Sequence, residues 1–276
     1  NTKFCLQSNG NAILYICEVY YSINFIYRNN KSGRRKMNNS LSMQLIGEFL
    51  GTAMLVLLGD GVCAGTNLNK SKSKGAGWIV IAFGWGFAVA FSVYSARWLC
   101  LGHYNPAVTF SMAIAHKLPW SSVLPYFVVQ VLGAFVGAIL VWLTYYPHWK
   151  ETTDDQEAIL GSFATVPAIR SYAWNFFTEA IATFVLVYGL LALTNGDLAA
   201  GLNPLLAGFL ITSVCLSLGG PTGVALNPAR DFGPRLAHQL MPIANKGQSD
   251  WAYSWVPIVA PLVGGALAAS LFNVLA

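Results

Sequence analysis

Long apolar stretches, separated by short polar or broken connectors, occupy most of this chain. Six of them have the length and hydropathy of membrane spans, at residues 44–65, 77–98, 123–146, 174–195, 201–219 and 254–275. An α-helix needs about 20 residues to cross a hydrocarbon core that is about 30 Å thick. The pattern therefore predicts an all-α membrane protein with six transmembrane helices.

Two shorter apolar segments each follow the same three-residue motif. The motifs are Asn105-Pro106-Ala107, between the second and third spans, and Asn227-Pro228-Ala229, between the fifth and sixth. Asn is a favoured N-cap and Pro a favoured first helical residue, so each motif predicts a helix start. The run 107–115 covers roughly 15 Å, and the second run stays amphipathic to about Leu240. We expect two re-entrant half-helices that enter the membrane from opposite faces and meet at its midplane.

The order of elements is the same in both halves of the chain: span, span, half-helix, span. Glu48 and Glu179 occupy equivalent places in the first span of each half. Because each copy has three spans, the second must be inserted upside down, which predicts an inverted repeat with copies at about 41–146 and 172–276. A carboxylate inside a span is costly unless it is satisfied. We expect both glutamates to accept hydrogen bonds from the re-entrant loops rather than to relay protons.

Composition agrees with a membrane protein, since 55% of the 276 residues are hydrophobic and only 10% are charged. The net charge of +5 owes much to a basic cluster before the first span, formed by Arg28, Lys31, Arg34, Arg35 and Lys36. Such a cluster ahead of an apolar segment marks the cytoplasmic side more often than a nucleic-acid site. Lys70, Lys72 and Lys74 follow the first span and weaken this bias.

The first 36 residues are rich in Asn and lack a clear period. We expect residues 1–40 to be an extension outside the channel domain, disordered or non-native, with the true start at Met37 or Met43. The five cysteines, at positions 5, 17, 63, 100 and 215, have no paired spacing and no nearby histidine cluster. They predict neither a disulfide framework nor a metal site, and we expect no cofactor.

The two re-entrant loops predict a cavity, because non-helical backbone at membrane depth persists only where protein buries it or water lines it. Helix N-termini carry the positive end of the helix dipole, so two of them facing one lumen would repel cations. The side-chain amides of Asn105 and Asn227 would offer N–H donors to the lumen. Ala107 and Ala229 are small enough for the half-helices to touch.

With these motifs, residues 41–276 resemble the major intrinsic protein (aquaporin) family. Four further residues, Asp231, Arg235, Pro257 and Ile258, resemble its glycerol-facilitator, or aquaglyceroporin, branch. The resemblance implies passive, uncoupled diffusion of glycerol, other small neutral solutes and water, with ions and protons excluded. It also implies a homotetramer with one pore per protomer, in the plasma membrane, with both termini cytoplasmic. In this branch the Asp231 position is thought to widen the pore loop; local pairing with Arg235 is the alternative.

The resemblance further implies a selectivity filter formed by Trp85, Cys215, Val224 and Arg230. The positions of Trp85 and Val224 correspond to an aromatic pair that cradles the carbon backbone of glycerol, while Arg230 donates to hydroxyl groups and repels cations. Val224 replaces the usual Phe and Cys215 the usual Gly. We therefore expect a wider solute range, including urea, dihydroxyacetone, hydrogen peroxide and protonated short carboxylic acids.

Each of two residues near the predicted pore allows two interpretations of its role. His103 matches a family histidine in the first re-entrant loop, where a structural hydrogen bond is favoured over gating. Cys215 either lines the constriction, within reach of mercurials, or packs in the core.

Other functions remain as alternatives: a water-selective aquaporin, or a secondary transporter, which also uses inverted repeats. An enzyme is disfavoured, since no nucleophile–base pair or metal-ligand spacing falls at a shared depth. We expect the partners to be the lipid bilayer and small neutral solutes, and not nucleic acid.

Overall fold

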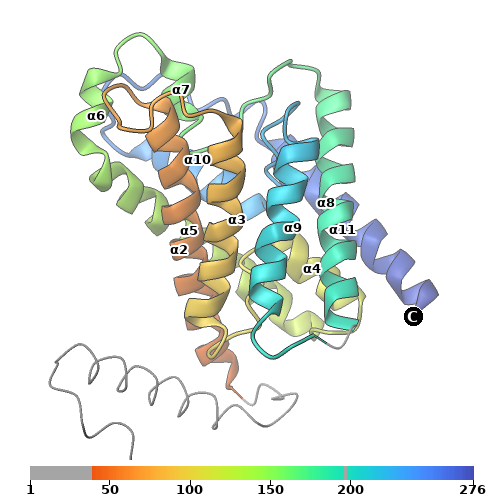
Figure 1. The fold of residues 1–276 in the computed structure, drawn as a ribbon. Helices are drawn as coiled ribbons and strands as arrows, with labels where there is room; N and C mark the ends of the chain where they lie inside the picture. Colours follow the sequence, from red (N-terminus) through yellow and green to blue (C-terminus); the bar gives the residue numbers. More distant parts are fainter. Residues whose placement is uncertain (1–38, 196–197) are drawn as a thin grey trace, which may run out of the picture. The chain divides into compact units, whose positions relative to one another are not determined.

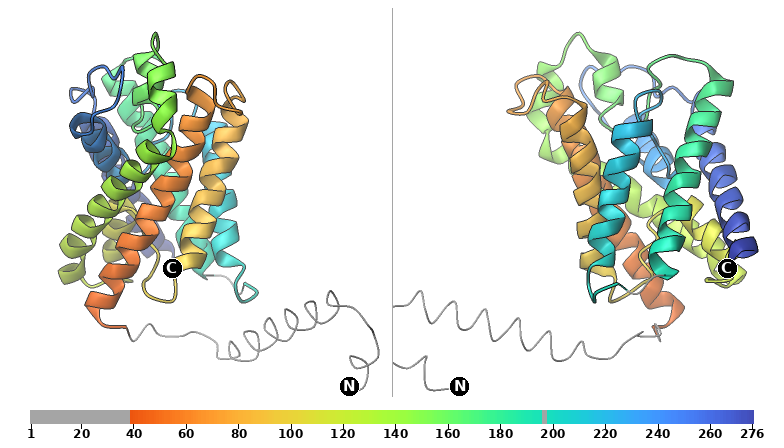
Figure 2. Two further views of the ribbon diagram at one scale, coloured as in Figure 1. Left: turned by 90° about the vertical axis from the view of Figure 1, so that its left-hand side faces the viewer. Right: turned by 45° about the vertical axis from the view of Figure 1, so that its right-hand side comes forward.

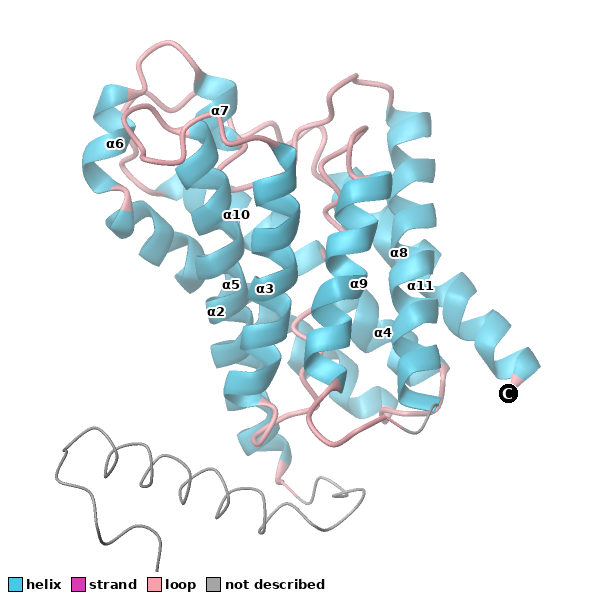
Figure 3. Ribbon diagram, viewed as in Figure 1, coloured by secondary structure: helices cyan, strands magenta, loops and turns pink. Residues whose placement is uncertain are grey.

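The computed structural model describes residues 39–195 and 198–276, so the expectations for residues 1–36 and for a start at Met37 lie outside the described residues. Within these ranges every regular element is a helix (Figure 3). The six long helices are α2 (Leu41–Asn67), α3 (Trp78–Ala96), α5 (Val123–Thr144), α8 (Tyr172–Asn195), α9 (Asn203–Leu218) and α11 (Trp255–Leu275). Each bound lies within three residues of the predicted one.

Five of these helices are long and apolar enough to cross a membrane. The sixth, α9, is apolar but has only 16 residues, and at 1.5 Å per residue it spans about 24 Å. The predicted all-α membrane fold is confirmed, with α9 as its shortest span.

Two short helices begin at the repeated motifs, as the sequence predicts. They are α4 (Pro106–Ile114) and α10 (Pro228–Leu240), each with Pro in its first turn and Asn at its N-cap. The Asn105 side chain accepts from the backbone N–H groups of the second and third helical residues, and Asn227 does the same. In Figures 1 and 2, α10 lies toward one end of the bundle and α4 toward the other. The chain therefore contains two half-helices that lie toward opposite ends of the bundle.

Small residues allow the long helices to pack in matched pairs. A Cβ atom on Gly133 of α5 would lie 2.4 Å from the Phe49 carbonyl of α2, and one on Gly264 of α11 would lie 2.0 Å from the Ala180 carbonyl of α8. Such approaches leave room only for glycine. Because α2 corresponds to α8 and α5 to α11, the two contacts are related by the inverted repeat.

The connector between the repeats contains two helices that the sequence pattern did not predict. They are α6 (Tyr146–Glu151) and α7 (Gln156–Leu160). A further short element, a 3₁₀ turn at Trp120–Ser122, lies outside this connector and precedes α5. The buried rings of Trp149 and Phe163 stack with centroids 5.3 Å apart. Isolated helices of five or six residues are unstable in water, so tertiary packing holds this connector in place.

Candidate functional site

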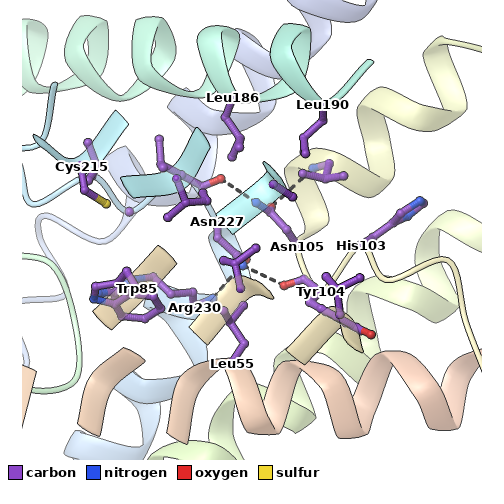
Figure 4. A pocket seen from close by; sticks show the side chains of 18 of the residues that line it. Leu55, Trp85, His103, Tyr104, Asn105, Leu186, Leu190, Cys215, Asn227 and Arg230 are labelled. Carbon is purple, nitrogen blue, oxygen red and sulfur yellow. Dashed lines mark hydrogen bonds between the residues drawn. The ribbon is translucent and has the colours of Figure 1, made fainter. Parts of the chain in front are cut away.

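The two Asn-Pro-Ala motifs meet and hold each other. The side-chain amide of Asn105 donates to the Leu226 carbonyl at 2.9 Å, and that of Asn227 donates to the Tyr104 carbonyl at 2.8 Å (Figure 4). Each amide carries two hydrogens, and these bonds use one. Both asparagines also line the cavity between the repeats. One N–H of each is therefore left to serve a molecule in the lumen.

The cavity is lined by pairs of residues that the inverted repeat relates. Leu55 and Leu186 each lie seven residues after the buried glutamate of their repeat, and both line the cavity. The lining also includes Val89 and Ile211, from α3 and α9. Residues 102–104 and 223–226 of the two re-entrant loops complete the lining. Both halves of the chain thus contribute to the lining, with apolar side chains and with the two re-entrant loops.

Two buried glutamates fix the re-entrant loops. Glu48 accepts from the backbone N–H groups of His103 and Tyr104 at 2.9 and 2.7 Å. Glu179 accepts from those of Ala225 and Leu226 at 2.9 and 3.0 Å. These bonds hold Tyr104 and Leu226 at φ of 49° and 57°, which is costly for residues other than glycine. The carboxylates offset that cost and aim the half-helix N-termini at the lumen.

The four predicted filter residues, Trp85, Cys215, Val224 and Arg230, all line the cavity. In Figure 4, Trp85, Arg230 and Cys215 lie toward one end of the cavity, and His103 lies toward the other. The guanidinium carbon of Arg230 stands 4.2 Å from the centroid of the Trp85 ring. Hydrogen-bond donors and a flat aromatic ring therefore adjoin each other among the predicted filter residues.

Two groups behind the lumen hold Arg230. The carbonyl of Phe163, in the connector after α7, accepts from Nη1 of Arg230 at 3.3 Å. The carboxylate of Asp60, in α2, lies 3.6 Å from the same atom. The sequence analysis missed both residues. Asp60 had a recognisable signal, because an ionisable residue inside an apolar span is a candidate functional residue by its position alone.

Among residues 39–195 and 198–276, no group of three or more His, Cys, Asp or Glu side chains is placed to hold a metal ion. The chemistry of the cavity within that part of the chain is that of hydrogen-bond donors, carbonyl acceptors and apolar walls.

Comparison with known proteins decides the family. The sequence profile described as Major intrinsic protein matches residues 35–272 of this chain. The chain belongs to the major intrinsic protein family. The resemblance seen in the motifs is thereby confirmed, and together with the apolar helices it makes the chain a multi-pass membrane protein.

Two relatives match this chain over nearly the whole of their own length. Glycerol uptake facilitator protein 3 from Lactiplantibacillus plantarum is 61% identical over 239 residues, which are 87% of this chain and 99% of that protein. Probable glycerol uptake facilitator protein from Thermotoga maritima is 59% identical over 228 residues, 83% of this chain and 97% of that protein.

A solved structure has a similar fold. The X-ray structure of the aquaglyceroporin from Plasmodium falciparum is similar with a TM-score of 0.75 and 31% sequence identity, and it covers 85% of this chain and 96% of that chain. The similarity extends over the major part of both chains.

Asp231 and Arg235 form a fully buried ion pair that ties α10 to the connector. Nε of Arg235 lies 2.8 Å from Oδ1 of Asp231. Oδ2 of Asp231 also accepts from the backbone N–H and hydroxyl of Thr165 at 2.9 and 2.6 Å. Local pairing is therefore real, and the same carboxylate also anchors the segment whose Phe163 carbonyl holds Arg230. Pro257 and Ile258, in α11, are buried and half-buried and are not among the cavity-lining residues.

His103 belongs to the hydrogen-bonded network beneath the first re-entrant loop. Its Nδ1 lies 3.2 Å from the Thr109 hydroxyl, and its ring lies 5.6 Å from that of Tyr126. Gln130 donates to both Thr109 and Glu48 at 2.9 Å. The histidine thus lines the cavity and is anchored at the same time.

The end of α10 farthest from its Asn cap is held by Lys246. Its ammonium group donates to the backbone carbonyls of His238, Gln239 and Met241 at 2.9, 2.8 and 2.6 Å. A cation suits these free carbonyls at a helix C-terminus. Burial lowers the pKa of Lys246. Both ends of α10 are therefore capped.

Proposed function

We propose that this chain is a channel for passive, uncoupled diffusion of glycerol, other small uncharged solutes and water, and that it excludes ions and protons. The observation that carries the proposal is the filter, where the Arg230 guanidinium stands 4.2 Å from the Trp85 ring centroid. A polyol presents hydroxyl groups and a carbon backbone, and this arrangement offers donors to the first and an apolar face to the second. Two relatives are named for glycerol uptake.

The rest of the lumen supports the same solute class. Its lining includes the apolar side chains of Leu55, Leu186, Val89 and Ile211, and the two asparagines Asn105 and Asn227 add polar groups. A small neutral solute can exchange its hydration for hydrogen bonds on one side and apolar contact on the other. Pockets with a few placed polar groups and apolar walls orient ligands in this way.

Ion exclusion follows from the charge of the lumen. The N-termini of α4 and α10 meet there and carry partial positive charge, and Arg230 adds a fixed charge to the filter. A cation would lose its hydration and meet a positive potential. A water molecule that accepts from both Asn105 and Asn227 cannot also accept from its neighbour in the file, which interrupts proton hopping.

The small side chains of Val224 and Cys215 support a wide range of solutes. Both line the cavity, and valine leaves more room than a phenylalanine at position 224 would. We infer that urea, dihydroxyacetone, hydrogen peroxide and protonated short carboxylic acids also pass.

The assembly and location that we propose are those of the family. The chain forms a homotetramer with one pore per protomer, in the plasma membrane, with cytoplasmic termini. Large apolar side chains on the outer faces of the helices, such as Phe87, Phe91 and Ile181, are about half exposed. Lipid and neighbouring protomers would cover them.

The test is solute flux in proteoliposomes that contain the purified chain, followed by stopped-flow light scattering. We expect glycerol and urea fluxes that rise linearly with the gradient, do not depend on a proton or sodium gradient, and have a low temperature dependence. A pH-sensitive dye inside the same vesicles should report no added proton leak. Saturating flux that follows an ion gradient would indicate a carrier, and flux of water alone would indicate a water-selective channel.

A blocked variant supplies the control for leakage through the lipid. Ala207 is the counterpart of Trp85, since each precedes a glycine of the pair Gly86 and Gly208, which contact each other between α3 and α9. Ala207 lines the cavity, so Ala207→Trp should fill the lumen from the other repeat. Its vesicles should match empty ones for every solute.

A further inference from the structure

Asp60 is a buried carboxylate inside the apolar helix α2, and it is not among the residues that line the cavity. The residue is fully buried, and neither of its side-chain oxygens has a hydrogen-bond partner among the described residues. The cation beside it is Arg230, whose Nη1 lies 3.6 Å from Oδ1 of Asp60. A buried carboxylate needs a compensating group. For Asp60 that group is the charged side chain of the filter.

The inverted repeat shows that the fold does not need a carboxylate at this place. Asp60 lies twelve residues after Glu48, and the residue twelve after Glu179 is Leu191. Arg230 lies three residues after Asn227, and the residue three after Asn105 is Val108. Leu191 and Val108 belong to one buried apolar cluster. One repeat thus has an acid and a base where the other has two apolar residues, and the acid and the base occur together.

α2 shapes the rest of the filter as well. Gly59 makes room for the Trp85 ring, since a Cβ atom there would lie 2.2 Å from it. The indole N–H of Trp85 donates to the Cys63 sulfur at 3.4 Å. Asp60 lies between these two residues in the sequence. The same stretch of α2 therefore supports both the flat wall of the filter and its guanidinium.

The other two predicted filter residues do not hold Arg230. Val224 and Cys215 are the remaining members of the ring, and neither offers the guanidinium a carboxylate or a large ring to pack against. Arg side chains keep considerable rotamer freedom unless they are held. The groups that hold this one are the Trp85 face, the Phe163 carbonyl and Asp60.

We infer that Asp60 is a positioning residue that determines the selectivity of the channel: it draws the Arg230 guanidinium against Trp85 and compensates its charge, which keeps the Val224 side of the ring open to glycerol. The inference rests on the proposed function. Without the carboxylate, the guanidinium is free to extend across the ring. The permeability to glycerol then falls more than the permeability to water, because water is the smaller molecule.

Three variants test the role of the carboxylate in proteoliposomes. Asp60→Leu installs the residue that the other repeat uses, Asp60→Asn removes the charge at nearly constant size, and Asp60→Glu keeps the charge. We expect the ratio of glycerol to water permeability to fall at least about threefold in the Leu and Asn variants and to stay within about twofold of wild type in the Glu variant. Asp154→Asn, an exposed carboxylate in the connector, should leave the ratio unchanged.

A double-mutant cycle with Arg230→Val tests whether Asp60 acts through Arg230. The double variant Asp60→Leu, Arg230→Val recreates the apolar pair of the other repeat. In the Arg230→Val background, Asp60→Leu should no longer change the permeability ratio. It should also raise the melting temperature of that variant, because Arg230→Val alone leaves a buried charge without its partner.

The outcomes separate this inference from the proposed function. If wild type conducts no glycerol, the proposed function fails first. If wild type conducts glycerol and Asp60→Leu keeps its permeability ratio, Asp60 is only structural and the inference is wrong. The inference is equally wrong if Asp60→Leu changes the ratio by the same factor with and without Arg230.

Discussion

The side-chain amide of Asn227 donates a hydrogen bond of 2.8 Å to the backbone carbonyl of Tyr104, which lies 123 positions earlier in the chain. Its counterpart, Asn105, donates to the carbonyl of Leu226. Each asparagine oxygen meanwhile caps its own half-helix. The same side chain thus starts a helix, joins the two repeats and keeps one N–H for the lumen.

Asn227→Asp should let protons through. Aspartate can still cap α10 with one oxygen, but it has no N–H for the Tyr104 carbonyl or for water in the lumen, and it adds negative charge where the half-helix dipoles are positive. We expect an increased proton flux, measured with a pH-sensitive dye in proteoliposomes, and a reduced glycerol flux.

Asn245→Asp is the matched control for this variant. The Asn245 amide also donates to a backbone carbonyl, that of Trp149 at 3.0 Å, but it is not among the cavity-lining residues. Its proton flux should equal that of wild type. An Asn227→Asp channel as proton-tight as Asn245→Asp would contradict the role assigned to the motif amides.

Glu179→Gln should loosen the second re-entrant loop. The carboxylate accepts from the N–H groups of Ala225 and Leu226, whereas glutamine would turn a donor toward one of them. Leaving a buried N–H unpaired costs about 2 kcal/mol. We expect a loss of that size in the free energy of unfolding in detergent, together with lower glycerol flux. Glu157→Gln, an exposed change in α7, should affect neither quantity. Unchanged stability in Glu179→Gln would show that the loop does not depend on this carboxylate.

The fold could be predicted because its signals are local and physical. Six apolar stretches of sufficient length had to become helices in a medium without water, and Asn followed by Pro ahead of an apolar run is a favoured helix start. The helices α6 and α7 were not predicted, since they depend on the packing of Trp149 and Phe163 rather than on their own sequence.

Some residues of the candidate site could likewise be predicted from the sequence, and others could not. The meeting of Asn105 and Asn227 follows from the symmetry of the repeat and needs no further knowledge. Trp85 and Cys215 came only from the resemblance, because α3 and α9 are apolar on all sides and no period marks the face toward the lumen. Asp60 was overlooked, although it is a charge in a span, because its partner Arg230 is 170 residues away and only the folded chain joins them.

Cys215 should be the site at which mercurials block the channel. Its side chain lines the cavity, while Cys100 is buried beneath the first loop, where its thiol lies 3.5 Å from the Tyr104 hydroxyl. We expect a mercurial to stop glycerol flux in wild type and in Cys100→Ser, and to leave Cys215→Ser conducting. The measurement is light scattering before and after the reagent, with recovery by a reducing thiol. Equal block of Cys215→Ser would place the reactive thiol elsewhere.

Val224→Phe should narrow the range of solutes more than it lowers water flow. Val224 lines the same cavity as Trp85 and Arg230, so a phenyl group at this position would reduce the aperture beside the guanidinium. Water is small enough to keep passing, whereas urea and dihydroxyacetone lose contact with the Arg230 donors or no longer fit. We expect their permeabilities relative to water to fall at least about threefold, measured by light scattering with each solute in turn.

The matched control for Val224→Phe is Val80→Phe, which makes the same change on an exposed face of α3 and should leave every permeability ratio as in wild type. Val224 has a φ of 40°, which is strained for Val and for Phe alike. Comparing the melting temperatures of wild type and Val224→Phe therefore separates a folding defect from a change in aperture. If Val224→Phe folds normally and its solute range is unchanged, position 224 is not part of the narrow ring, and the filter must be assigned to other residues.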